Sequence, residues 1–205
     1  MDPEWPNLPN GTLSEWDRSV LELLSIEGLT RFTFDGLKRR LGVHPETLSR
    51  VLSRLEDQGV IEKQNDGYKV VPKARDAFNS QPMSSKETGV PLLQTLLPPN
   101  IAVKEILNDL KGKWFGTLRW LGYAEGHEAI TLKWITEDGG IQVDAAFSES
   151  SLSIEAKMLS EGNLSEALIA SYQLIAYISK IYERSGRIQH VDYTFFGSDP
   201  TLMWM

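Results

Sequence analysis

The sequence predicts an α+β protein in which a small helical domain is followed by a domain with an antiparallel sheet and one long helix. Within the first 58 residues, three segments have apolar residues at helical spacing, and a β-hairpin pattern follows them. Four strand-like segments lie between residues 114 and 158, and a long apolar helical segment covers 164–184. Helices that come first and strands that come later are typical of α+β architecture.

Composition and length limit the classes of protein to be considered. The 205 residues suffice for two small domains and contain no cysteine, which excludes disulfides, thiolate metal sites and a cysteine nucleophile. The opening MDPEWPNLPNG has neither the basic nor the apolar region of a secretory signal. The longest strongly apolar run, residues 167–178, is shorter than the roughly 20 residues that a bilayer span needs. We therefore expect a soluble, cytoplasmic protein without a membrane partner.

Charge is distributed unevenly along the chain, whose formal net charge is -7. Residues 30–75 contain ten basic and six acidic residues, an excess of +4. Residues 81–205 contain ten basic and fifteen acidic residues, an excess of -5. Because exposed charges more than about 8 Å apart are largely screened at physiological salt, nucleic-acid binding depends on the local excess. The overall acidity therefore does not exclude a DNA-binding N-terminal domain.

The first domain is expected to begin with a helix at 13–27. Thr12 and Glu15 have capping-box spacing ahead of its apolar positions, and Gly28 is a suitable C-terminal stop. The second helix, FDGLKRRL, is expected to follow the N-cap Thr33.

A third helix is expected at 45–58. Pro45 suits its first position, where the missing N–H costs nothing, and Gly59 ends it. One face of this helix is an apolar stripe and the opposite face is polar. The next residues, VIEKQNDGYKVV, predict a β-hairpin that turns at Asp66 and Gly67.

This order of three helices and a hairpin is that of a winged helix-turn-helix. Residues 14–71 resemble the winged-helix domains of prokaryotic transcription regulators of the MarR, ArsR and IclR kind. The resemblance rests on LKRRLGVHPETLSRVLSRLEDQGVIEK, which has a positioning helix, a Gly-Val turn, a recognition helix rich in Ser and Thr, and Leu-Glu-x-x-Gly-Val-Ile before the wing. It implies a sequence-specific regulator that binds double-stranded DNA as a homodimer.

The resemblance also implies which residues contact DNA. Short hydroxyl side chains permit close approach, Arg binds guanine edges, and Lys binds phosphate. Glu46 either accepts from cytosine or only stabilises the helix N-terminus. The expected DNA-binding residues are Lys38, Arg39, Arg40, His44, Glu46, Thr47, Ser49, Arg50, Ser53, Arg54, Lys63, Asn65 and Lys69.

Winged helices also serve as protein-binding modules, since a fold does not fix a function. An adaptor in transcription or chromosome-maintenance machinery is therefore the second interpretation. The basic excess of residues 30–75 favours DNA.

The chain is divided by a segment rich in Pro, Ser and Thr. We predict a DNA-binding domain at 1–78, a linker at 79–100, and a dimerisation or effector domain at 101–205. The linker contains a leucine-rich patch, which we expect to dock on a domain or on a partner chain. The elements expected in the last domain are a helix at 101–111, strands at 114–124, 129–136, 141–148 and 151–158, a helix at 164–184 and a strand at 190–197.

The long helix is apolar on nearly all sides, which is typical of a helix buried against more than one neighbour. One neighbour is the sheet; the other is either a second chain or the winged helix of the same chain. We expect dimerisation. The expected dimer-interface residues are Leu168, Tyr172, Ile175, Ile178 and Tyr182.

Aromatic residues are numerous in the last domain and form either its core or a pocket for a small-molecule effector. They are Trp114, Trp120, Tyr123, Trp134, Tyr172 and Tyr177. The three histidines are far apart, and no phosphate loop or nucleophile elbow occurs. We therefore expect no enzymatic activity, no catalytic residues, no metal and no cofactor.

Overall fold

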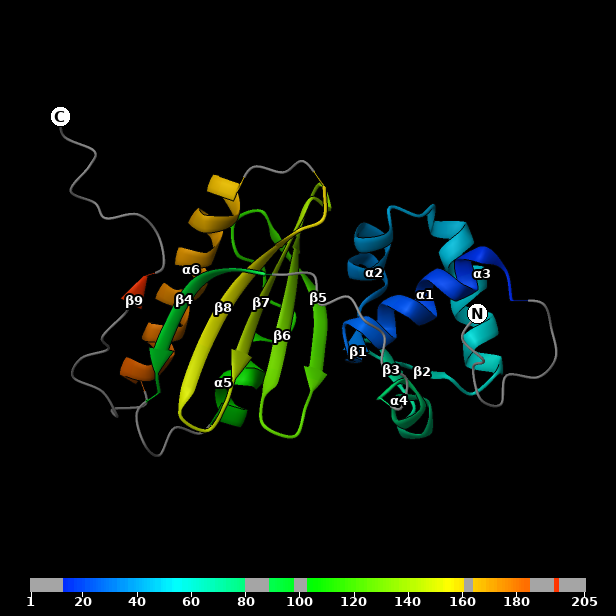
Figure 1. Cartoon of the computed structure of the whole chain (residues 1–205), viewed down its shortest axis with the longest axis horizontal. Helices are drawn as coiled ribbons and strands as arrows, with labels where there is room; N and C mark the ends of the chain where they lie inside the picture. The colour runs from blue at the N-terminus through cyan, green and yellow to red at the C-terminus, as the bar shows by residue number, and fades with distance from the viewer. Residues whose placement is uncertain (1–12, 80–88, 98–102, 161–163, 185–193, 196–205) are drawn as a thin grey trace.

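A computed structural model describes residues 13–79, 89–97, 103–160, 164–184 and 194–195. It confirms a mixed structure of helices and antiparallel sheet (Figure 1). The N-terminal part contains α1 (Glu15–Ile26), β1 (Leu29–Phe32), α2 (Phe34–Leu41), α3 (Pro45–Asp57), β2 (Ile61–Gln64), β3 (Gly67–Val70) and α4 (Pro72–Asn79). The second part contains β4 (Val90–Leu96), α5 (Val103–Leu110), β5 (Leu118–Glu125), β6 (Ile130–Thr136), β7 (Ile141–Phe147), β8 (Ser151–Met158), α6 (Leu164–Arg184) and β9 (Thr194–Phe195).

The starts of the first helices follow from their caps. Helix α1 is capped by Ser14 and Asp17, which form a reciprocal capping box, so the expected pairing of Thr12 with Glu15 is wrong. A box needs a partner three residues after the cap, and Asp17 holds that position for Ser14. Thr33 caps α2 as expected, with its side chain accepting from the Gly36 N–H.

The described strands form one antiparallel sheet in the order β2-β3-β1-β5-β6-β7-β8-β4-β9. Strand β1 was not expected from the sequence, because four residues are too few to show a period. It pairs with β3 on one side and with β5 on the other. The sheet of the N-terminal part therefore continues into the sheet of the second part without a break (Figure 1).

The segment expected as a linker contains a strand. Residues 90–96 form β4, which pairs with β8 and β9 inside the sheet. Leu92, Leu93 and Leu97 are buried in the core of the second part, whereas Leu96 is 79% exposed. Burial of these leucines outweighs the loop-like composition of the segment, including Pro91, and a shift in the pairing register follows that proline.

Each part has its own hydrophobic core. In the second part, α5 and α6 pack on one face of the sheet, around Trp134 and Val143. Trp120, Trp134 and Tyr123 are buried there, so three of the expected aromatic residues are core residues. In the N-terminal part, the core lies among α1, α2 and α3. No helix in the described ranges has the length and apolar character that a bilayer crossing requires.

Candidate nucleic-acid interface

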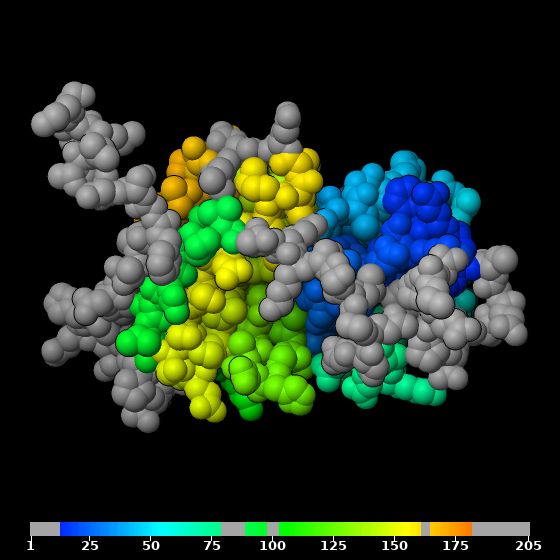
Figure 2. Space-filling view, viewed as in Figure 1, coloured from blue at the N-terminus to red at the C-terminus, as the bar shows by residue number. Residues whose placement is uncertain are grey.

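Helix α3 presents a polar face at the end of the molecule farthest from α6 (Figure 1). Leu48, Val51, Leu52 and Leu55 are at most 1% exposed and fix the opposite face of the helix in the core. Because these four residues recur at helical spacing, the residues between them point outward. Figure 2 shows this end of the molecule, in blue and cyan, on the opposite side from the orange surface of α6.

The exposed face of α3 carries side chains that suit a nucleic acid. Ser49, Arg50 and Ser53 are exposed, and Thr47 is half-buried. Arg50 forms an ion pair with Glu46 one turn earlier, at 2.5 Å. Both partners are exposed, and an exposed i,i+4 pair contributes only about 0.5 kcal/mol, so a stronger acceptor can replace Glu46.

The N-terminus of α3 is capped by His44. Its Nδ1 accepts from the Glu46 N–H at 3.4 Å, and Pro45 occupies the first helical position. This places His44 at the surface in a capping role, with its ring next to the candidate interface.

Arg54 is occupied by a contact within the protein. Its guanidinium donates to Asp17 Oδ1, at 2.6 Å from Nη2, and to Ser14 Oγ at 3.2 Å. Burial raises the pKa of Asp17, but the hydrogen bonds from Arg54 and Ser14 outweigh that effect and lower it. Arg54 therefore fastens α3 to the start of α1, and we leave it out of the proposed DNA surface.

The three consecutive basic residues of α2 have different surroundings. Lys38 pairs with Asp35 at 2.9 Å. Arg39 has no ion-pair partner among the residues that the structure describes. Arg40 is 13% exposed and its Nε donates to Gln142 Oε1 at 3.0 Å, so its guanidinium faces the second part of the protein and not solvent. Only Lys38 and Arg39 of this group remain candidates for phosphate contacts.

The hairpin adds further candidates beside α3. Lys63 and Asn65 are exposed and Lys69 is half-buried. In the described part of the chain, neither Lys63 nor Lys69 has an ion-pair partner. Asp66, at the hairpin turn, lies 3.7 Å from Arg31 of β1.

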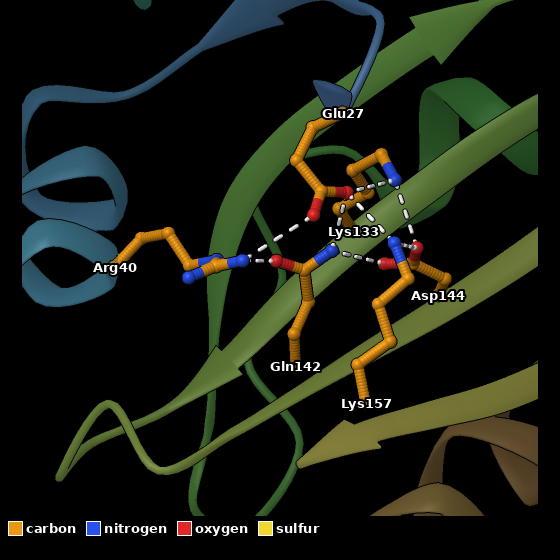
Figure 3. Close-up of polar contacts among 6 residues, drawn as sticks. All are labelled: Glu27, Arg40, Lys133, Gln142, Asp144 and Lys157. Atoms are coloured by element: carbon orange, nitrogen blue, oxygen red, sulfur yellow. Dashed lines mark hydrogen bonds and ion pairs between the residues drawn. The ribbon is translucent and has the colours of Figure 1, made fainter. Parts of the chain in front are cut away.

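A buried network of charged residues joins the N-terminal part to the second part (Figure 3). Glu27 is the C-cap residue of α1 and has a fully buried side chain. Its Oε2 accepts from Lys133 Nζ at 2.8 Å and from Lys157 Nζ at 2.9 Å. The members of the network are Glu27, Arg40, Lys133, Gln142, Asp144 and Lys157.

The sheet supplies the second carboxylate of this network. Asp144 accepts from Lys133 at 2.8 Å and lies 3.0 Å from Lys157. The Gln142 amide donates to both Glu27 and Asp144 at 2.8 Å. Cross-strand pairing places Lys133 opposite Asp144, and Gln142 opposite Lys157.

The charges of the network stabilise one another. Burial would raise the pKa of Glu27, but the ammonium groups of Lys133 and Lys157 and the hydrogen bonds they donate hold it at about 2. Burial would lower the pKa of Lys157, but Asp144 and Glu27 raise it. Glu27 is thus ionised at neutral pH, and the network fixes the position of α2 relative to the sheet.

Helix α2 also lies against the backbone of the second part. The Thr33 hydroxyl donates to the Trp120 carbonyl at 3.1 Å. A Cβ placed on Gly36 would lie 2.6 Å from the Leu121 Cα, so only glycine permits this approach.

Ion pairs with residues outside 30–75 reduce the basic excess expected from the sequence. Arg40 pairs with Glu27, Arg54 with Asp17, and Arg75 with Glu125. Asp17 and Glu125 lower the excess from +4 to +2, whereas Glu27 and Asp144 together are balanced by Lys133 and Lys157. The net positive charge of residues 30–75 is therefore smaller than the sequence suggests.

The residues expected at a dimer interface lie on different sides of α6. Leu168 and Tyr172 are 37% and 47% exposed, whereas Ile175 and Ile178 are buried in the core of their own part. The Tyr182 side chain lies outside the described residues. Ile169, which was not selected from the sequence, is 60% exposed beside Leu168.

The described residues contain no group of His, Asp or Glu side chains arranged to hold a metal ion. In the charged network, the fully buried Glu27 carboxylate accepts hydrogen bonds from Lys133, Gln142 and Lys157. Its geometry serves to join the two parts of the protein.

Comparison with known proteins gives one family match. Residues 37–77 match the Crp-like helix-turn-helix domain, and this span runs from α2 through α3 and the hairpin into α4. Comparisons with curated proteins and with solved structures gave no match. The match supports a helix-turn-helix DNA-binding domain and points to a regulator rather than an enzyme. Residues 37–77 are thus similar to a Crp-like helix-turn-helix domain, in which α3 is the second helix.

Proposed function

We propose that this protein is a sequence-specific, DNA-binding transcription regulator of the cytoplasm. In this proposal the N-terminal part is a winged helix, α3 is its recognition helix and the β2–β3 hairpin is its wing. The observation that carries the proposal is the exposed Ser49, Arg50 and Ser53 face of α3 within a segment similar to a DNA-binding domain.

The side chains divide into base-reading and phosphate-binding roles. Arg50 exchanges its exposed partner Glu46 for the O6 and N7 atoms of a guanine. Ser49 and Ser53 allow the helix to approach the floor of the major groove. Arg39 and Lys63, which have no ion-pair partner among the described residues, bind phosphates and set the register.

The second part, which we propose as a separate domain that begins at β4, holds α2 in place and brings two copies together. The exposed Leu168, Ile169 and Tyr172 form an apolar patch on α6 that suits a symmetric helix-to-helix contact. Two-fold symmetry would match a palindromic site. Sedimentation velocity at micromolar concentration tests this; a monomeric mass would count against dimerisation.

The salt dependence of DNA binding tests the central part of the proposal. Fluorescence anisotropy is measured with the full chain and genomic DNA fragments, from low to physiological salt. Each phosphate contact releases counterions, so log affinity falls with log salt by a slope of about 0.9 per contact. With Arg39, Lys38, Lys63 and Lys69 as contacts, a slope of about 3 to 4 is expected per protomer.

The small charge excess supports a second candidate function. A segment with a net excess of only +2 and an internally paired Arg50 is also suited to a protein partner. An adaptor of this kind would bind no DNA fragment even at low salt. The same titration therefore separates the two candidates.

A further inference from the structure

A small cavity lies where the hairpin of the N-terminal part meets the second part. Its volume is about 150 Å³. This is about the size of an engineered protein cavity that binds benzene. It is lined by Arg31, Phe32, Thr33, Asp66, Tyr68, Lys111, Gly112, Trp120 and Tyr123.

Aromatic rings are the first feature of the lining. Trp120 and Tyr123 belong to β5 and are 8% and 6% exposed, and Tyr68 of β3 stacks on Phe32 of β1 with ring centroids 5.5 Å apart. Four of the nine lining residues are therefore aromatic, which suits a flat ring of similar size.

Two cations are the second feature. Lys111 Nζ lies 4.6 Å from the centroid of the Tyr123 ring and has no carboxylate partner within the described ranges. Within the described residues, the ion pair of Arg31 is with Asp66, at 3.7 Å, and Asp66 is 75% exposed. An exposed pair at this distance contributes little, so another carboxylate can take the place of Asp66 at small cost. The lining then offers two positive charges to one anionic group.

Hydrogen-bond donors complete the lining. Burial raises the pKa of Tyr123, and although Arg31 opposes this effect, Glu125 and Asp66 add to it. Burial and Glu56 raise the pKa of Tyr68. Both phenols are therefore protonated at neutral pH and can donate to a carboxylate oxygen.

We propose that this cavity is a binding site for a small aromatic carboxylate with a single ring. The ring packs among Tyr68, Trp120 and Tyr123, and the carboxylate binds Arg31 and Lys111. Size, aromatic lining and the two cations each point to this class of ligand. The ligand-binding claim itself does not depend on DNA binding.

The cavity adjoins the hairpin turn, so a ligand bound there can affect the candidate DNA surface. Asp66 is at the turn of the hairpin, next to Asn65 and three residues from Lys63. A bound carboxylate displaces Asp66 from Arg31 and so changes the contacts of the hairpin turn. Regulation of DNA affinity by the ligand follows from this, and that step rests on the function proposed above.

Calorimetric titration of the full chain with sodium benzoate tests the site. We expect a dissociation constant of about 1 mM or below. Lys111→Met should weaken binding about tenfold, because it removes a charge-assisted contact. Lys113→Met is the matched control, since its ammonium lies over Tyr177, 5.4 Å from the ring centroid, and does not line the cavity.

Benzamide and acetate separate the chemical contributions, because the first lacks the charge and the second lacks the ring. The proposal requires that both bind much more weakly than benzoate. Absence of benzoate binding overturns it, as does equal weakening by Lys111→Met and Lys113→Met. Benzoate binding that is lost in Lys111→Met, with no DNA binding under any condition, would uphold the site while refuting the proposed function.

Discussion

Replacement of Glu27 by Gln measures how strongly the buried network joins the two parts of the protein. The substitution keeps the shape of the side chain and removes its charge. Lys133 and Lys157 then share the single carboxylate of Asp144, and Arg40 loses its ion pair with Glu27. A buried cation that loses its partner is costly, because burial has already removed its hydration.

The expected loss of stability follows from the pKa of Glu27. That pKa is about 2 in the folded protein and 4.5 in a model carboxyl group. At 1.36 kcal/mol per pKa unit, ionised Glu27 contributes about 3 kcal/mol to the free energy of unfolding at neutral pH. This agrees with the roughly 3–5 kcal/mol typical of breaking a buried ion pair.

The same numbers fix the pH dependence. Because folding lowers the pKa of Glu27, its contribution is fully present above pH 4.5 and is lost as the pH falls towards 2. The wild-type free energy of unfolding should therefore fall more steeply between pH 5 and 2 than that of Glu27→Gln, by a total of about 3 kcal/mol.

Urea denaturation of both proteins, at pH 7 and at steps down to pH 2, provides the measurement. Glu125→Gln is the control, because Glu125 is 46% exposed in its pair with Arg75 and should cost less than about 1 kcal/mol. The reasoning would be refuted by a loss below about 1 kcal/mol in Glu27→Gln, together with an unchanged pH slope.

Three further changes test other parts of the structure. Gly36→Ala places a Cβ 2.6 Å from the Leu121 Cα, so thermal denaturation should show a loss of about 2 kcal/mol or more; an unchanged melting temperature would contradict this packing. Asp17→Asn removes the carboxylate shared by the α1 cap and Arg54, and should cost about 1–2 kcal/mol in urea denaturation; no loss would show that the cap contributes nothing. Ile169→Glu puts a charge in the exposed patch of α6 and should convert a dimer to a monomer in sedimentation velocity, whereas an intact dimer would exclude this patch.

Local sequence signals predict the elements that local interactions decide. Pro45 and the apolar spacing from Leu48 to Leu55 place α3 within one residue of its observed end. The segments at 151–158 and 164–184 were predicted with the observed bounds of β8 and α6, because their alternation and length are unambiguous. The exposed face of α3 lies opposite its buried apolar positions, so the same apolar spacing predicts it.

Long-range contacts explain what the sequence does not predict. Strand β1 is short and becomes a strand through its pairing with β3 and β5. Lys133 and Asp144 alternate with core residues along their strands, a pattern that indicates a solvent-facing position. Only the tertiary fold places Glu27 over them, which turns an apparently exposed face into a buried junction.

Long-range contacts also determine which of the expected basic residues are available to bind DNA. Arg40 and Arg54 appear equivalent to Arg39 and Arg50 in the sequence, yet their partners Glu27 and Asp17 lie 13 and 37 residues away. No local pattern marks such pairs. The candidate site is therefore smaller than the sequence suggests and centres on Arg39 and Arg50.

The affinity of the Arg39→Ala, Arg50→Ala double variant for DNA tests the central claim most directly. Anisotropy of the genomic fragment that the wild type binds most tightly is compared for the wild type, this variant, and a Lys104→Ala, Lys180→Ala control that removes two exposed charges from the second part. The account predicts a loss of about 100-fold in the double variant, with circular dichroism unchanged, and almost none in the control. Equal affinity of all three proteins for DNA would contradict recognition through α3.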